Sequence, residues 1–270
     1  MDMTHIAKRS LRTLWGRKHL WFFGFFMAAA GGASADGAGS SAHGPLPQWL
    51  LPLLIAFGVV GLAVLVMNVL SEAALIRGVQ RDQDGESLGI AEGFRVGGRH
   101  FLTVLVLKGL LALGFAGAGV VIAAPVALGA FEVVPMVPAI LVALPLLVVS
   151  IPGALTLYFL YEYALRFAVL EGFGTRDAIR AARRLLHGRL GDSVRLTLLS
   201  FAGQLGGGLV TAVAALPGAA LGLGAYFAFG LDLGAVVGAL LVAPAVVLVQ
   251  GATGTFRSSV WTLGFLGARG

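Results

Sequence analysis

The chain has 270 residues, of which 58% are hydrophobic and 12% charged, with 40 glycines, no cysteine and a net charge of +6. A soluble domain averages about 45–50% apolar and about 25% charged residues, so this chain has too few polar groups to cover a water-soluble globule. The absence of cysteine excludes disulfides, thiolate metal sites and cysteine nucleophiles. We therefore expect an all-α integral membrane protein, in which glycine allows helices to approach closely.

Six apolar segments follow one another along the chain. A hydrocarbon core about 30 Å thick requires about 20 residues of helix, and these segments do not alternate polar and apolar residues as strands of a membrane barrel do. The first segment is short, and the fifth has an alternative end at 229, beyond Pro217. The segments are 19–32, 49–70, 101–124, 137–160, 196–216 and 234–254. The sequence predicts a helical bundle with about six transmembrane helices.

Basic residues occur on only one side of these segments. The linkers 33–48, 128–136 and 231–233 contain no Lys or Arg, whereas every other linker and both termini contain several or at least one. Positive residues remain on the cytoplasmic side. Arginine far exceeds lysine, which is typical of GC-rich bacterial genomes. We therefore predict a multi-pass protein of the bacterial inner membrane, with both termini in the cytoplasm and three hairpins that point outward.

The N-terminal segment has an alternative interpretation. Its basic start, the apolar run 20–30 and the sequence Ala33-Ser34-Ala35 resemble a secretory signal peptide with an A-x-A cleavage site. Cleavage near residue 35 would leave five spans and the same orientation for the rest of the chain. The long basic region and the participation of this segment in an internal repeat favour a retained span.

Three parts of the chain share one plan, in which a basic stretch ends in Gly-Arg and an apolar hairpin follows. The Gly-Arg pairs are Gly16-Arg17, Gly98-Arg99 and Gly188-Arg189. The sequence therefore predicts a single transmembrane domain over residues 1–270, with repeats at 1–74, 84–165 and 175–257.

Two of the basic stretches are amphipathic. In 175–187, residues such as Ala178, Ala182 and Leu186 share one helical face opposite the arginines, and Thr175 is the expected N-cap. Such helices lie in the cytoplasmic membrane interface with their basic side chains toward anionic headgroups; the alternative is that they only anchor the topology. The residues predicted to bind lipid headgroups are Arg12, Arg17, Lys18, Arg99, Arg176, Arg180, Arg183, Arg184 and Arg189.

The stretch between the second and third spans differs. Gly89, Gly93 and Gly97 are spaced by four residues, which predicts a smooth helical face for close contact. The preceding run 82–86, Asp-Gln-Asp-Gly-Glu, resembles the beginning of a calcium loop but has Gly93 where the closing Glu would stand. We interpret this run as a turn that leads to Ser87.

The sequence contains no catalytic or metal-binding motif that we recognise. His5, His19, His43, His100 and His187 do not have metal-ligand spacing, and no G-x-S-x-G, P-loop or H-E-x-x-H sequence occurs. We therefore expect no enzymatic activity, no metal and no cofactor. The positions of the positive charges favour a membrane surface over nucleic acid as the partner.

Ionisable groups inside a membrane are candidates for function. Lys108 lies roughly 13 Å beyond Arg99 along a helix. It can snorkel to the interface, or it can form an intramembrane ion pair with Glu72 or Glu162, which lie at the ends of the second and fourth spans. Such a pair would fix packing or, alternatively, carry a proton or an ion. The polar residues expected to add hydrogen bonds between helices are Asn68, Gln204 and Gln250.

An Asp-Gly turn, an interfacial helix rich in Ala and Arg that ends in Gly-Arg, and a hairpin rich in Gly and Leu resemble a loose group of bacterial membrane proteins. This group includes small uncharacterised inner-membrane proteins and the membrane domain sometimes fused to glycerophosphodiester phosphodiesterases. Segments 84–99 and 175–195 carry the resemblance. It implies a six-span helical domain, and it transfers no catalytic residue because no phosphodiesterase domain is present.

Together these patterns predict a non-enzymatic membrane protein that organises lipids or partner proteins at the cytoplasmic leaflet. The expected partners are membrane lipids with anionic headgroups, other membrane proteins or a second copy of the chain. The alternative is a small permease that uses Lys108 with Glu72 and Glu162.

Overall fold

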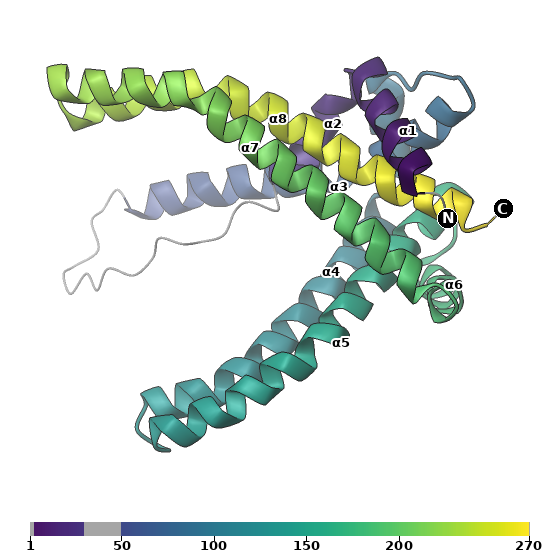
Figure 1. Cartoon of the computed structure of the whole chain (residues 1–270), viewed down its shortest axis with the longest axis horizontal. Coiled ribbons are helices and arrows are strands. Elements are labelled where there is room, and N and C mark those ends of the chain that lie inside the picture. The colour runs from purple at the N-terminus through teal and green to yellow at the C-terminus, as the bar shows by residue number, and fades with distance from the viewer. Residues whose placement is uncertain (1–2, 30–49, 270) are drawn as a thin grey trace. The chain divides into compact units, whose positions relative to one another are not determined.

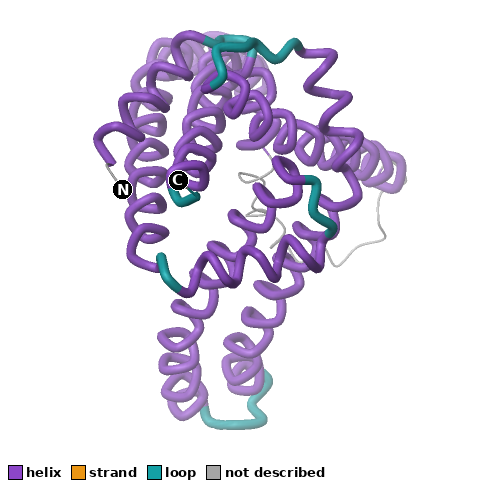
Figure 2. The backbone as a smooth tube through the Cα atoms, turned by 90° about the vertical axis from the view of Figure 1, so that its right-hand side faces the viewer, coloured by secondary structure: helices purple, strands orange, loops and turns teal. Residues whose placement is uncertain are grey.

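The structure is a computed structural model that describes residues 3–29 and 50–269. This part of the chain folds into eight α-helices and contains no strand (Figures 1 and 2). The helices are α1 (Met3–Gly16), α2 (Leu20–Ala29), α3 (Leu50–Gln83), α4 (Ile90–Ala130), α5 (Met136–Glu171), α6 (Thr175–His187), α7 (Leu190–Phe229) and α8 (Leu231–Gly267). The prediction of an all-α fold is confirmed.

Five helices in the described residues are long and apolar enough to cross a membrane. They are α4, α5 and most of α3, α7 and α8. The chain is therefore a multi-span helical membrane protein. The first predicted span corresponds to α2, whose ten residues rise about 15 Å, half the thickness of a hydrocarbon core. Residues 30–49, which include the Ala33-Ser34-Ala35 sequence, lie outside the described part. A membrane span at the first predicted segment, which would be the sixth in total, therefore stays a prediction.

The long helices extend beyond the apolar segments that predicted them. Helix α4 begins at Ile90, so the basic stretch before the third span belongs to the same continuous helix. Helix α7 continues through Pro217 to Phe229, which is the alternative end predicted for the fifth segment. Helix α8 continues past the predicted end at residue 254 to Gly267. The α8 extension is polar in sequence, but Ser258, Ser259 and Thr262 are fully buried. Hydropathy therefore underestimates helices whose polar residues face protein.

The helices form two compact units, one from residues 1–99 with 194–270 and the other from residues 100–193. In the first unit, α2 packs against α3 and α8, and α1 and α3 also pack against α8. In the second unit, α6 packs against α5. The predicted single domain and its three repeats stay predictions.

Helix α2 and helix α8 touch through their backbones. A Cβ atom on Gly251 would lie 2.6 Å from the carbonyl oxygen of Trp21, and one on Gly24 would overlap the carbonyl oxygen of Gly251. The Thr255 hydroxyl of α8 lies 3.1 Å from the Leu20 carbonyl oxygen of α2. Glycine is therefore required at this crossing, because any side chain would separate the two helices.

The same short helix fills the core of the first unit. Leu20, Phe23 and Met27 form a buried cluster with Ala74 and Leu75 of α3. The backbone at the end of α2 is also satisfied, because the Asn68 Nδ2 donates to the carbonyl oxygens of Phe26 and Met27 at 2.7 and 3.1 Å. This confirms the expected interhelical hydrogen bond of Asn68.

The predicted smooth face of α4 is confirmed in part. A Cβ atom on Gly93 would lie 2.6 Å from the Phe23 ring, and one on Gly97 would lie 2.6 Å from the Leu70 carbonyl oxygen. The prediction is wrong for Gly89. A Cβ atom added there would have no neighbour within 4 Å, and Gly89 lies before α4 begins. Close contact therefore starts only where α4 meets α2 and α3.

Helix α6 is amphipathic as predicted. Ala178, Ala182 and Leu186 are buried on the face that packs against α5. The expected N-cap is wrong by one residue, because Gly174 occupies that position and Thr175 is already the first helical residue. Gly174 has an extended backbone and, having no side chain, adds no side-chain capping hydrogen bond.

Candidate functional site

Helix α1 has a buried face and a basic face, and the buried face fixes its position. Ile6, Ser10, Thr13 and Leu14 are buried. At the C-terminal end, where helix carbonyls lack partners, the Trp21 indole Nε1 donates to the Leu14 carbonyl oxygen at 2.9 Å. The corner between α1 and α2 is therefore held by a side chain of α2.

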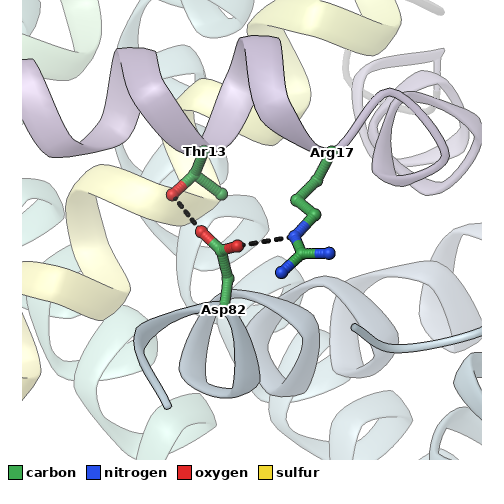
Figure 3. Close-up of polar contacts among 3 residues, drawn as sticks. All are labelled: Thr13, Arg17 and Asp82. Carbon is green, nitrogen blue, oxygen red and sulfur yellow. Dashed lines mark hydrogen bonds and ion pairs between the residues drawn. The ribbon is translucent and has the colours of Figure 1, made fainter. Parts of the chain in front are cut away.

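Asp82, in the last turn of α3, binds the end of α1 and the residue that follows it with its two carboxylate oxygens (Figure 3). Thr13 Oγ1 donates to Oδ2 at 2.7 Å, and Arg17 Nε donates to Oδ1 at 2.7 Å. The Arg17 and Asp82 side chains are 28% and 17% exposed, so water screens this pair less than a surface pair. Asp82 thus attaches α1 to the end of α3.

The acidic run that contains Asp82 forms a turn, as predicted. Gly85 has a φ of 81°, a left-handed conformation that favours glycine. Arg81 lies 2.7 Å from Glu92 and 3.7 Å from Glu86 and so closes the turn. Two carboxylates of the run, Asp82 and Glu86, therefore face arginines. No group of His, Asp or Glu suited to a metal ion occurs in residues 3–29 and 50–269.

A cavity of 650 Å³ lies between α1 and the end of α3, and we call it the basic pocket. Among the described residues, its charged lining consists of four cations, one carboxylate and one histidine. These residues are His5, Lys8, Arg9, Arg12, Arg17 and Asp82. Because four of these described residues are cations and one is a carboxylate, together they carry an excess of three positive charges.

Three of these cations are free to bind a ligand. Lys8, Arg9 and Arg12 are exposed, and they form no ion pair within the described residues. Arg17 neutralises Asp82 and is held in place by it. Clustered Lys and Arg side chains attract anions, and guanidinium groups match the geometry of phosphate oxygens. The pocket can therefore hold an anionic group.

The basic pocket continues into a second cavity of 390 Å³. The two cavities share His5, Arg9 and Gln83, and the second is also lined by apolar side chains. These side chains are Ile6, Leu263 and Leu266. The combined cavity thus has a cationic end beside α1 and an apolar end beside the C-terminus of α8.

Of the residues predicted to bind headgroups, Arg12 and Arg17 meet at the basic pocket. Lys18 is exposed in the turn after α1, and Arg99 is exposed on α4; neither lines the pocket. The remaining predicted residues belong to the second unit, where most are exposed on α6 and Arg189 is half-buried. The exposed ones are Arg176, Arg180, Arg183 and Arg184. Arg180 is 3.2 Å from Asp177.

The predicted site omitted His5, Lys8, Arg9 and Asp82. Lys8, Arg9 and Arg12 share one face of α1, so helical spacing was sufficient to group the basic residues. The sequence contained no signal for Asp82, because it contacts residues that lie 65 and 69 positions earlier in the chain.

The predicted intramembrane carboxylates are both buried. Glu162 is fully buried and lies 2.5 Å from Arg166, one helical turn later on α5. Sequence reasoning missed this pair, because it placed Arg166 in a linker. Glu72 is 3% exposed and Lys108 is half-buried. The pairing of Lys108 with Glu72 or Glu162 stays a prediction.

Comparisons of the chain with protein-family models, with curated proteins and with solved structures found no match.

Proposed function

We propose that this multi-span protein binds anionic lipid headgroups at the cytoplasmic leaflet of the bacterial inner membrane and organises lipids there without catalysing a reaction. The observation that carries the proposal is the basic pocket, in which four cations surround one carboxylate. Each basic residue near a membrane surface contributes about 1 kcal/mol of attraction to anionic lipid. The exposed arginines of α6 supply a second basic surface for the same leaflet.

The adjoining apolar cavity favours a lipid over a soluble anion. A lipid has a charged headgroup joined to an apolar acyl region, and the combined cavity likewise has a cationic end joined to an apolar end. The headgroup would lie beside Lys8, Arg9 and Arg12, and the acyl region beside Ile6 and Leu263. A soluble anion would leave the apolar part of the cavity in contact with water.

Binding is tested by native mass spectrometry of the full chain in mild detergent, with phosphatidylglycerol and phosphatidylethanolamine as probes. The variant Lys8→Gln/Arg9→Gln/Arg12→Gln should weaken phosphatidylglycerol binding about 100-fold, because about 1 kcal/mol is lost per residue. The matched control Arg180→Gln/Arg183→Gln/Arg184→Gln removes the same charge from α6. Undiminished binding by the α1 variant contradicts the proposal, and equal losses in both variants would show that net charge alone attracts the lipid.

The proposal includes six spans in three outward hairpins, with both termini in the cytoplasm. It is supported by the arginine-rich linkers and by the close packing of α2 against α8. Because the chain lacks cysteine, Ser41→Cys and Ser87→Cys report the two sides of the membrane. A membrane-impermeant maleimide should label Ser41→Cys in intact spheroplasts and Ser87→Cys only after permeabilisation. The reverse pattern would refute the orientation.

A permease is the second candidate function, and the burial of Glu72 and Glu162 in long apolar helices favours it. Ionisable groups at such positions often take part in ion or proton pathways. The test is solute or proton flux into proteoliposomes that contain the wild-type chain or Lys108→Leu. An unchanged flux in Lys108→Leu would rule out a relay through this lysine.

A further inference from the structure

Gln83, the last residue of α3, lines both the basic pocket and the second cavity of 390 Å³. His5 and Arg9 of α1 also line both cavities. Gln83 therefore lies at the junction between the cationic end and the apolar end of the combined cavity. A ligand that extends from one end to the other must pass this residue.

The carboxamide oxygen of Gln83 lacks a hydrogen-bond donor. It is buried, and none of the described residues donates to it. A buried acceptor without a donor is less stable than one that is paired. The last torsion of a glutamine side chain is soft, so this oxygen can turn toward a donor in the adjoining cavities. The junction therefore favours a ligand that carries a hydroxyl group at this point.

The apolar end of the combined cavity is narrow, because its side chains come from two helices that pack against each other. Ile6 belongs to α1, and Leu263 and Leu266 belong to α8. Helix α1 packs against α8. Ile6 and Leu263 are buried, so packing holds both side chains in place. The space beside them fits one acyl chain better than two chains side by side.

The order of groups along the combined cavity matches one class of lipid. Lys8, Arg9 and Arg12 line the cationic end, and guanidinium groups match the geometry of phosphate oxygens. Next come the unpaired oxygen of Gln83 and then the apolar side chains. A lysophospholipid has the same order, with a phosphate, a free glycerol hydroxyl and one acyl chain. A phospholipid with two chains has an ester in place of the hydroxyl, and an ester only accepts hydrogen bonds.

We propose that the combined cavity binds a lysophospholipid. Its phosphate lies among the cations of α1, its free hydroxyl donates to Gln83, and its single acyl chain lies beside Ile6 and Leu263. This assignment rests on the proposed function, because it requires an anionic lipid in the basic pocket, and it adds the class of lipid. A lipid with two chains can place its headgroup in the same pocket, but it offers Gln83 no donor and leaves its second chain outside.

The experiment compares three lipids with the same phosphoglycerol headgroup and charge, by native mass spectrometry of the full chain in mild detergent. Phosphatidylglycerol has two chains, lysophosphatidylglycerol has one chain and the free hydroxyl, and 2-deoxy-lysophosphatidylglycerol has one chain without that hydroxyl. The wild type should bind lysophosphatidylglycerol about fivefold more tightly than the 2-deoxy lipid, because one hydrogen bond is lost, and more tightly than phosphatidylglycerol. Equal binding of the three lipids overturns the proposal.

Substitutions then locate the effect. Gln83→Leu removes the acceptor and should bind lysophosphatidylglycerol and the 2-deoxy lipid equally, and a preference that persists in this variant overturns the proposal. The matched control Gln80→Leu removes a carboxamide that lines neither cavity and should keep the preference. Leu266→Trp changes a half-buried side chain that lines the apolar end, and it should weaken binding of both single-chain lipids about tenfold. Unchanged binding by this variant also overturns the proposal.

The same data separate this inference from the proposed function. If phosphatidylglycerol binding depends on Lys8, Arg9 and Arg12 but lysophosphatidylglycerol binds no more tightly, the basic pocket binds anionic headgroups and the lysophospholipid assignment is wrong. If none of the three lipids binds, both the proposed function and this assignment are overturned.

Discussion

The attachment of α1 to α3 depends on Asp82, and Asp82→Ala should release it. The substitution removes one hydrogen bond from Thr13 and one charge-assisted bond from Arg17, both 2.7 Å long. A hydrogen bond to a charged group contributes about 1.5–3 kcal/mol, but both side chains of the ion pair remain partly exposed, so we discount the sum to about 2 kcal/mol. Local opening of α1 should then become about 30-fold more frequent.

Hydrogen–deuterium exchange of peptides from residues 3–16 measures this opening in detergent. Asp82→Ala should lower the protection of α1 amides about 30-fold while the core of α5 keeps its protection. The matched control is Asp84→Ala, because Asp84 lies in the same turn, is exposed and makes no side-chain hydrogen bond or ion pair with the described residues of α1. Equal protection of α1 in Asp82→Ala and Asp84→Ala would refute the idea that this carboxylate holds the helix.

Three other substitutions test the packing. Gly24→Ala should lower the midpoint of thermal unfolding in detergent by the equivalent of about 1–3 kcal/mol, because the added Cβ atom would overlap α8. Gly16→Ala is the control and should leave the midpoint unchanged, because a Cβ atom there meets open space. Equal midpoints in the two variants would contradict the contact. Glu162→Gln should destabilise the chain by about 3–5 kcal/mol, since it leaves the buried guanidinium of Arg166 without its carboxylate, and an unchanged unfolding midpoint would show that the pair is dispensable. Asn68→Leu should cost about 1–3 kcal/mol by leaving two carbonyl oxygens of α2 without a donor, and faster exchange confined to α2 would locate the effect.

The sequence alone was sufficient for the class of protein and for the approximate place of the five long helices that the structure describes, whereas the sixth predicted span stays a prediction. The free energy of transferring a helix into lipid depends on the composition of a short window of sequence. Segments such as 101–124 and 137–160 can therefore be predicted without tertiary information. The amphipathic helix α6 was equally predictable, because its buried and exposed faces follow from helical periodicity.

Only the tertiary structure decided where polar residues act. Asp82 looked like part of a turn, and its role in holding α1 depends on a contact across 65 residues of chain. Gln204 and Gln250 lie 46 positions apart in the sequence, yet they line one cavity because α7 and α8 pack in antiparallel register. The local sequence pattern predicts which face of a helix is polar. The residues that contact this face are determined by packing between helices, and a short window of sequence holds no information about that packing.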